Sequence, residues 1–280
     1  MGAIGGTVPE MPERMSSEFL QRVVAALVLI PIALSAVYVG GWMFTLLAAV
    51  AVILMASEWE QVTGGARAGR HTYLNVLAGL TALTAVSYGQ LDIALITVAV
   101  GAIASFLLPR HDGVHSRWPS IGVIAVAVPA ICLIWLRAAD SGMTVIVWLL
   151  LVLWATDSGA YFVGRLIGGA RLAPLISPGK TWAGFFGGTA SGALVGLAIS
   201  ILVQDVSTIR AVLASVFVSL AGQGGDLAIS AVKRRFGVKD MGTIIPGHGG
   251  VLDRLDSLLF GAIAVSALAL VFEGTVPLWP

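Results

Sequence analysis

Five polar residues near the C-terminus fall into two groups, and the spacing within each group places its members on one face of a helix. Asp226, Ser230 and Lys233 lie at i, i+4 and i+7, and Asp253 and Asp256 lie at i and i+3 of the next apolar segment. Such spacings bring side chains to the same side of an α-helix. Carboxylate oxygens are ligands for Mg²⁺, and lysine or arginine takes the remaining charge of a nucleoside triphosphate. We therefore predict that the three aspartates bind Mg²⁺, with room for a second cation.

Basic residues surround these aspartates and complete a candidate phosphate site. Arg234 follows Lys233 directly, and Lys239 lies six residues after Lys233. "ISPGKTWAG" places Ser177, Lys180 and Thr181 before an apolar run. A helix N-terminus beside a lysine favours an anion such as phosphate. The alternative is that the lysine only reaches out to the membrane interface. "GKT" is not a P-loop, because the required earlier glycine is replaced by Pro174 and we expect no preceding strand.

The stretch "PGHGGVLDRLD" adds further candidates for substrate binding. Gly249 and Gly250 can let the backbone approach a ligand closely. His248 can contact phosphate or donate a proton, or simply stabilise the turn; it is a poor Mg²⁺ ligand, since that ion prefers oxygen. Arg254 faces away from its two neighbouring aspartates and can bind lipid headgroups. In the simplest alternative, those aspartates only form ion pairs with Arg254 or Lys233.

The composition indicates that membrane helices position these residues. Of 280 residues, 58% are hydrophobic and only 11% are charged, which is too little polar surface for a water-soluble fold. The single cysteine, Cys132, excludes an internal disulfide and a cysteine-based metal cluster. We predict an all-α, polytopic integral membrane bundle with a tail (1–20), N-terminal helices (21–140) and a catalytic region (141–280). We expect nine of these helices to span a bilayer, with eight or ten as alternatives. The predicted spans are 21–40, 42–58, 72–90, 91–109, 118–137, 142–163, 182–203, 208–229 and 254–273.

The distribution of positive charge predicts an orientation. With nine spans, the chain's lysines and arginines divide 14 to 2 between the two membrane faces. The positive-inside rule then predicts a cytosolic N-terminus and active site in the cell membrane, and a C-terminus outside. The sparse face carries Arg137 and Arg210, and the other carries Arg14, Arg22, Arg67, Arg70, Arg110, Arg117, Arg165, Arg171, Lys180, Lys233, Arg234, Arg235, Lys239 and Arg254.

One predicted span has a glycine at every fourth position. Gly184, Gly188, Gly192 and Gly196 form a smooth strip that lets a second helix approach closely. We favour packing within the subunit over a dimer contact.

At this point a resemblance becomes visible. The stretch from Ser230 to Asp256, "SAVKRRFGVKDMGTIIPGHGGVLDRLD", resembles the signature of the phosphatidate cytidylyltransferases, or CDP-diacylglycerol synthases. "DSGAYFVGRLIGG" and "ISPGKTWAG" resemble a second block of the same family. The resemblance covers about the last half of the chain, whereas the first half is similar only in being a hydrophobic bundle.

The resemblance implies a helical, usually dimeric membrane enzyme that condenses CTP with phosphatidic acid and depends on Mg²⁺. It implies Asp226, Asp253 and Asp256 as metal ligands, with Lys180, Ser230, Lys233 and Arg234 near phosphates. Ala183 stands where the family usually has Glu. A transporter with an interfacial ion site and another phospholipid-forming transferase are the competing interpretations, and no nucleic acid partner is expected.

Overall fold

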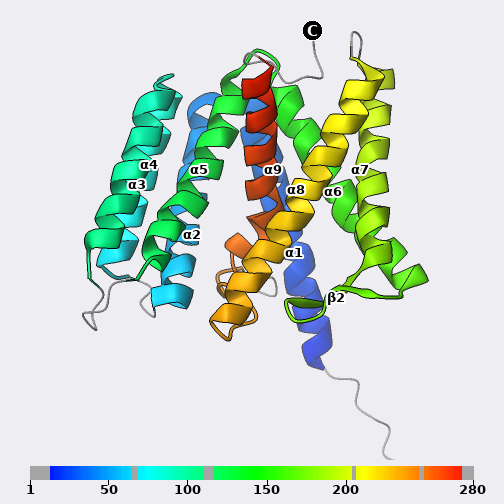
Figure 1. Cartoon of the computed structure of the whole chain (residues 1–280), viewed down its shortest axis with the longest axis horizontal. Coiled ribbons are helices and arrows are strands. Elements are labelled where there is room, and N and C mark those ends of the chain that lie inside the picture. The colour runs from blue at the N-terminus through cyan, green and yellow to red at the C-terminus, as the bar shows by residue number, and fades with distance from the viewer. Residues whose placement is uncertain (1–12, 65–67, 110–115, 204–205, 246–248, 273–280) are drawn as a thin grey trace, which may run out of the picture.

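The computed structural model describes residues 13–64, 68–109, 116–203, 206–245 and 249–272, and these ranges form an all-α bundle with one short hairpin (Figure 1). The elements of this described part are α1 (Glu13–Val39), α2 (Gly41–Gly64), α3 (Arg70–Ser87), α4 (Leu91–Leu107), α5 (Trp118–Ala138), α6 (Gly142–Ile167), β1 (Arg171–Ala173), β2 (Ser177–Thr181), α7 (Trp182–Leu202), α8 (Thr208–Arg235) and α9 (Leu252–Val271).

Each predicted span corresponds to one helix of the described chain. Six of them, α2 and α5 to α9, are long and apolar enough to cross a membrane, and the apolar stretches Leu27–Val39 and Leu91–Leu107 are shorter. Large hydrophobic side chains cover much of the outer surface, as expected for helices that face lipid. The chain is therefore an integral membrane protein.

The helices extend beyond several predicted boundaries. Residues 13–20, predicted as part of a flexible tail, already belong to α1; residues 1–12 of that tail lie outside the described residues. The segment "DLAISAVK" continues α8 without a break, as its spacing of polar residues required. These extensions arise because helix-forming residues such as Glu, Leu, Gln and Arg continue the backbone hydrogen bonding beyond the apolar run.

The hairpin of β1 and β2 was not predicted. Its strands pair antiparallel, with Arg171 opposite Thr181 and Ala173 opposite Ser177. Pro174 occupies the second position of a tight turn closed by the Ile176 amide and the Ala173 carbonyl, 3.1 Å apart, and proline favours that position. The expectation that no strand precedes "GKT" was wrong, because β1 precedes this tripeptide and β2 contains it. A P-loop is still excluded, because the required earlier glycine is Pro174.

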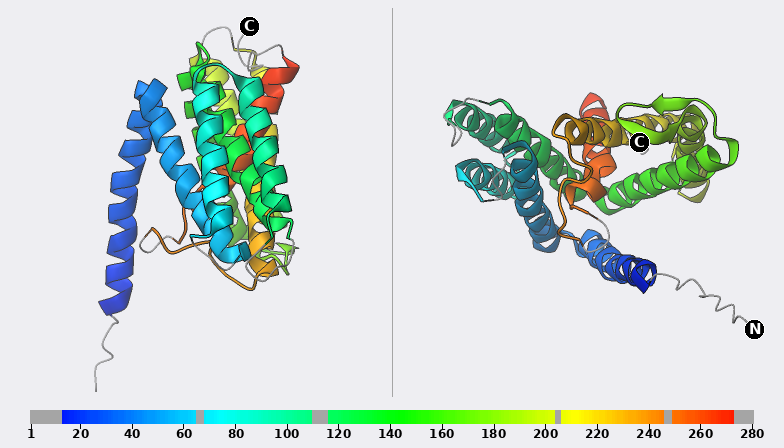
Figure 2. Two further views of the ribbon diagram at one scale, coloured as in Figure 1. Left: turned by 90° about the vertical axis from the view of Figure 1, so that its left-hand side faces the viewer. Right: turned by 90° about the horizontal axis from the view of Figure 1, so that it is seen from below.

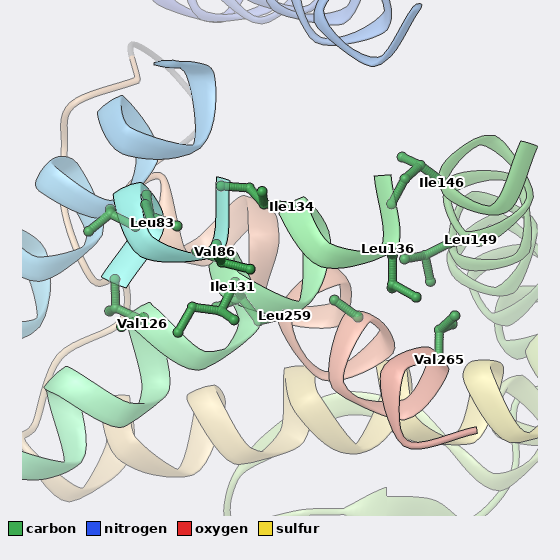
Figure 3. Packing of buried hydrophobic residues seen from close by; sticks show 14 of the residues in the cluster. Leu83, Val86, Val126, Ile131, Ile134, Leu136, Ile146, Leu149, Leu259 and Val265 are labelled. Atoms are coloured by element: carbon green, nitrogen blue, oxygen red, sulfur yellow. The ribbon is translucent and has the colours of Figure 1, made fainter. Parts of the chain in front are cut away.

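Helix α9 lies at the centre of the bundle and joins its two halves. It packs against α8 and α6 on one side and against α5 on the other. Figure 3 shows Leu259 and Val265 of α9 beside Ile131 of α5 and Leu149 of α6. Close packing of this kind holds membrane helices together, because lipid supplies no hydrophobic drive.

The glycine strip of α7 packs within the chain, as predicted. A Cβ on Gly184 or Gly188 would lie 2.7 Å from a carbonyl oxygen of α6, and one on Gly192 would lie 3.0 Å from Ser219 of α8. In the same place, the Thr156 and Ser219 hydroxyls are hydrogen bonded at 2.9 Å. The strip therefore joins α6, α7 and α8 in one closely packed unit.

Helix α1 diverges from the bundle (Figure 2) and is attached mainly near its C-terminal end. The Arg137 guanidinium of α5 donates to the carbonyl oxygens of Val37 at 2.7 Å and Tyr38 at 3.0 Å. Carbonyls in the last turn of a helix lack intrahelical partners, so this arginine caps α1 from another helix. In contrast, Leu27 is 69% exposed and Ile30 is 45% exposed.

Substituting valine for Gly188 should destabilise the unit of α6, α7 and α8. The larger side chain collides with backbone that cannot move aside, and overpacking of this kind costs about 1–3 kcal/mol. Thermal unfolding in detergent should show a lower Tm for Gly188→Val. Gly224→Ala is the control, because an added Cβ meets nothing within 4 Å there. An equal Tm for both variants would contradict the packing described.

Candidate active site

One end of the bundle gathers the polar side chains singled out above. We call it the site end; it is formed by the last turns of α6 and α8, the first turns of α7 and α9, and the hairpin, at the bottom of Figure 1. The N-terminal end of α8 and the C-terminal end of α5, which carry Arg210 and Arg137, lie at the opposite end. Charge is therefore concentrated where four membrane helices end.

A buried ion pair lies at the centre of the site end. Lys233 Nζ of α8 is 2.8 Å from Asp253 Oδ1 of α9, and the two side chains are only 11% and 5% exposed. The other carboxylate oxygen accepts the backbone amides of Met241 at 2.7 Å and Gly250 at 3.0 Å. Asp253 thus joins α8 and α9 and binds two separate points of the connection between them. Removing a charged partner from such a site is costly, since the other charge stays buried.

A second, more accessible pair lies beside the first. Lys180 Nζ, at the end of β2, is 2.7 Å from Asp226 Oδ2 of α8, and these side chains are 27% and 35% exposed. The Ser230 hydroxyl donates to Asp226 Oδ1 at 3.2 Å, which confirms the predicted i to i+4 relation on α8. The Lys180–Asp226 pair is more exposed than the buried Lys233–Asp253 pair, so it is better placed to exchange its partner for a ligand.

Two further carboxylates approach Asp226 closely enough to repel it. Asp256 is buried on α9, where its Oδ1 accepts the Ser257 amide at 2.8 Å. Asp157 lies on α6, exposed, near Asp226 and Lys180. Asp157, Asp226 and Asp256 interact electrostatically with one another. Unlike these three, Asp253 is committed to Lys233 and the backbone.

Asp157 was quoted in the sequence motif but not selected as a ligand. The available signal was its position inside an otherwise apolar predicted span, because an ionisable residue there indicates function by default. Nothing in the sequence indicates that α6 passes beside α8 at that level. The structure therefore adds Asp157 to the three predicted aspartates, and this residue comes from α6, which contributes none of the predicted metal ligands.

The carboxylates fit a metal ion only if the ion brings other ligands with it. Among the described residues, no group of three His, Cys, Asp or Glu side chains is arranged to hold a metal ion alone. Mg²⁺ in nucleotide enzymes usually binds one or two carboxylates and completes its shell with phosphates and water. One or two of the carboxylates of Asp157, Asp226 and Asp256 offer the hard oxygen donors that suit such an ion.

Other candidates lie around this centre with separate contacts. Arg234 is exposed and donates from Nε to the Ile176 carbonyl at 3.2 Å, so it holds the hairpin against α8. The Thr181 hydroxyl accepts the Gly184 amide at 3.0 Å and caps α7. Ser177 is half-buried and Lys239 is exposed, and neither side chain has a hydrogen-bond or ion-pair partner in the described ranges.

The glycine-rich connection is described only in part. His248 lies outside the described residues, so its predicted roles stay predictions. Gly249 has a φ of +87°, which favours glycine, and its carbonyl accepts the Ile245 amide at 3.0 Å. Gly250 donates its amide to Asp253, and Arg254 is exposed on α9.

Sequence reasoning also missed Glu58 of α2, which is fully buried at the start of α9. It accepts the amides of Val251 and Leu252, so a residue from the first half of the chain contacts the predicted catalytic segment. The signal was an acidic residue at the end of an apolar run.

Comparison with known proteins connects this geometry with a family. A model of the cytidylyltransferase family matches residues 20–272. A phosphatidate cytidylyltransferase of Brucella suis is 38% identical over 268 residues, covering 93% of this chain and 97% of that protein. The Bacillus subtilis protein of the same name is 48% identical over 120 residues, 42% of this chain and 45% of its own length. Similarity therefore extends into the first half, beyond the region where we expected it.

Replacing Asp253 by Asn should destabilise the protein, because it leaves the Lys233 ammonium buried without its counter-charge. Breaking a buried pair costs about 3–5 kcal/mol. We expect a clearly lower Tm for Asp253→Asn in detergent and partial recovery in the double variant Asp253→Asn/Lys233→Met. Asp240→Asn, at an exposed neighbouring carboxylate, is the control. If Asp253→Asn melts with the wild type, the pair does not stabilise the fold.

Proposed function

This chain belongs to the cytidylyltransferase family, and we propose that it condenses CTP with phosphatidate to give CDP-diacylglycerol and pyrophosphate. The observation that carries the proposal is the concentration of buried and half-buried charge at one end of an otherwise apolar bundle. One substrate is anchored in the bilayer and the other is dissolved in water, so the reaction must occur at their boundary. A site formed by the ends of α6 to α9 satisfies that constraint.

The reaction joins two polyanions. A phosphate oxygen of phosphatidate bonds to the α-phosphorus of CTP, and the bond from that phosphorus to the bridging oxygen breaks. Pyrophosphate leaves with the electron pair of the broken bond. Phosphoryl transfer of this kind depends mainly on positioning and on neutralising charge. Phosphatidate is ionised at neutral pH, so the protein need not supply a general base.

The basic residues would supply much of this neutralisation. Lys180 is half-exposed and shared with Asp226, so it can turn to an incoming phosphate while remaining close to its partner. Arg234 lies on the exposed side of α8 next to the hairpin. Lys233 is held by Asp253 in a fixed position. The catalytic roles of these residues remain our proposal, together with substrate contacts from Ser177, Ser230, Lys239 and Arg254.

We further propose that Mg²⁺ binds with CTP at this site. The ion would neutralise phosphate charge and stabilise the leaving pyrophosphate. One or two of the mutually repelling carboxylates of Asp226, Asp256 and Asp157 would hold it. Asp253, the third predicted ligand, has oxygens that already accept three hydrogen bonds, so we assign it mainly to holding Lys233 and the backbone. A second cation remains part of the proposal.

We also propose how many helices cross the membrane and in which direction the chain is oriented. All nine helices would cross the cell membrane, with the site end in the cytosol and the C-terminus outside. The division of 14 basic residues against 2 supports this orientation. A homodimer is expected from the family; the glycine strip of α7 would not form its interface, since all four glycines are buried within the chain.

Cytidine-labelled CTP should yield a labelled lipid only in the presence of phosphatidate and Mg²⁺. Chelation should stop the reaction, and Asp256→Asn should lower kcat/KM on the order of 100-fold or more, because a carboxylate at the proposed metal is lost. Thin-layer chromatography of the lipid and a pyrophosphate assay measure both products. Asp92→Asn, a substitution in the first turn of α4, is the control. Undiminished transfer by Asp256→Asn would remove this residue from the mechanism.

The orientation can be tested at the two ends of α8. Arg210 and Arg235 are both exposed and lie near opposite ends of this helix, which is about 42 Å long at 1.5 Å per residue. In a Cys132→Ala background, an impermeant thiol reagent added to intact cells should label Arg210→Cys and leave Arg235→Cys unlabelled until the membrane is opened. The reverse pattern would contradict the proposed orientation.

A further inference from the structure

Glu58 connects the first half of the bundle with the start of α9. Its side chain is completely buried at the end of α2. Oε1 accepts the Val251 amide at 2.8 Å, and Oε2 accepts the Leu252 amide at 2.9 Å, so a single carboxylate binds consecutive amides 193 and 194 residues away in the sequence. Hydrogen bonds to a charged acceptor are shorter and stronger than neutral ones.

The local sequence leaves the start of α9 without a cap of the usual kind. Its N-cap residue, Val251, offers no side-chain acceptor, whereas Ser, Thr, Asp or Asn normally fills this position. The first amides of a helix need acceptors, and the helix dipole favours negative charge there. Glu58 of α2 supplies both the hydrogen-bond acceptors and the negative charge.

The backbone around Glu58 is shaped to admit its carboxylate. A Cβ added to Gly242 would lie 2.6 Å from Glu58 Oε1, and one added to Gly250 would lie 2.7 Å from Oε2. Both distances are shorter than real Cβ contacts allow. These glycines are therefore explained by the close approach of Glu58, which accounts for Gly250 without a bound ligand.

We infer that Glu58 is a positioning residue for the transfer reaction: it fixes the start of α9, and with it Asp253 and Asp256, relative to α8. This inference rests on the proposed function. Asp253 holds the amides of Met241 and Gly250, and Glu58 holds the next two amides. Together, the two carboxylates fix both sides of the connection between α8 and α9.

The neighbouring Glu60 provides a matched contrast. It is also buried near the end of α2, at 3% exposure, but its Oε1 accepts from Asn75 of α3 at 3.2 Å, within the first half. A general requirement for buried acids in α2 would affect both residues. A requirement for positioning the reaction centre would affect Glu58 far more.

The experiment compares Glu58→Gln with Glu60→Gln in the full-length protein in detergent. Glutamine nearly preserves shape but removes the charge and turns an NH₂ group toward one of the amides. We expect faster hydrogen exchange confined to residues 241–253 in Glu58→Gln. We also expect kcat per folded molecule to fall on the order of 100-fold with a nearly unchanged KM for phosphatidate, because misplacement by about 1 Å can cost that much. Glu60→Gln should change neither.

A second pair of variants keeps the test decisive if Glu58→Gln folds poorly. Gly242→Ala should reproduce the local exchange and the loss of kcat by displacing the carboxylate. In a Glu58→Ala background, where that space is empty, Gly242→Ala should add little, which is the non-additivity expected of residues in contact. Wild-type exchange in 241–253, additive effects, or equal losses in the two glutamine variants would overturn the inference. Failure of the wild type to make CDP-diacylglycerol would instead refute the proposed function, and the exchange data would still test the contact.

Discussion

The ion pair of Lys233 and Asp253 determines how the last two helices meet. Charges with 11% and 5% exposure are tolerated only if each has a partner and the remaining oxygen has donors. Asp253 meets that condition with the amides of Met241 and Gly250, so the pair also fixes the connection between the helices. Because the buried pair already fixes the two helices, the more exposed pair of Lys180 and Asp226 is not needed to hold them together.

The helices could be predicted from the sequence because membrane helices are set by apolar length, which is a local property. The positions of Asp226 and Ser230 on α8 followed for the same reason, since helical periodicity alone brings them together, and their hydrogen bond confirms it. The β1–β2 hairpin was missed because its signal, Pro174 in a tight turn, is short and lies within a polar connection.

The composition of the site could be predicted less fully, because contacts between helices depend on three-dimensional packing. No periodicity within α6 indicates that Asp157 lies beside Asp226 of α8. Likewise, Val251 gives no local sign that its amide is bound by Glu58, 193 residues earlier. The motif near the C-terminus identified residues in one segment, whereas the arrangement around them is assembled from α2, α6, β2 and α8.

A site built from helix ends needs hydrogen-bond partners for the backbone groups there, and this need explains the role of the first half of the chain. Every helix end exposes backbone groups that need partners, and burial inside the bundle, as at Leu252, removes water as the alternative. Some of those partners are side chains from neighbouring helices, as Arg137 is for α1 and Glu58 is for α9. The first half of the bundle can thus contribute to the reaction without touching substrate, which agrees with a family match that begins at residue 20.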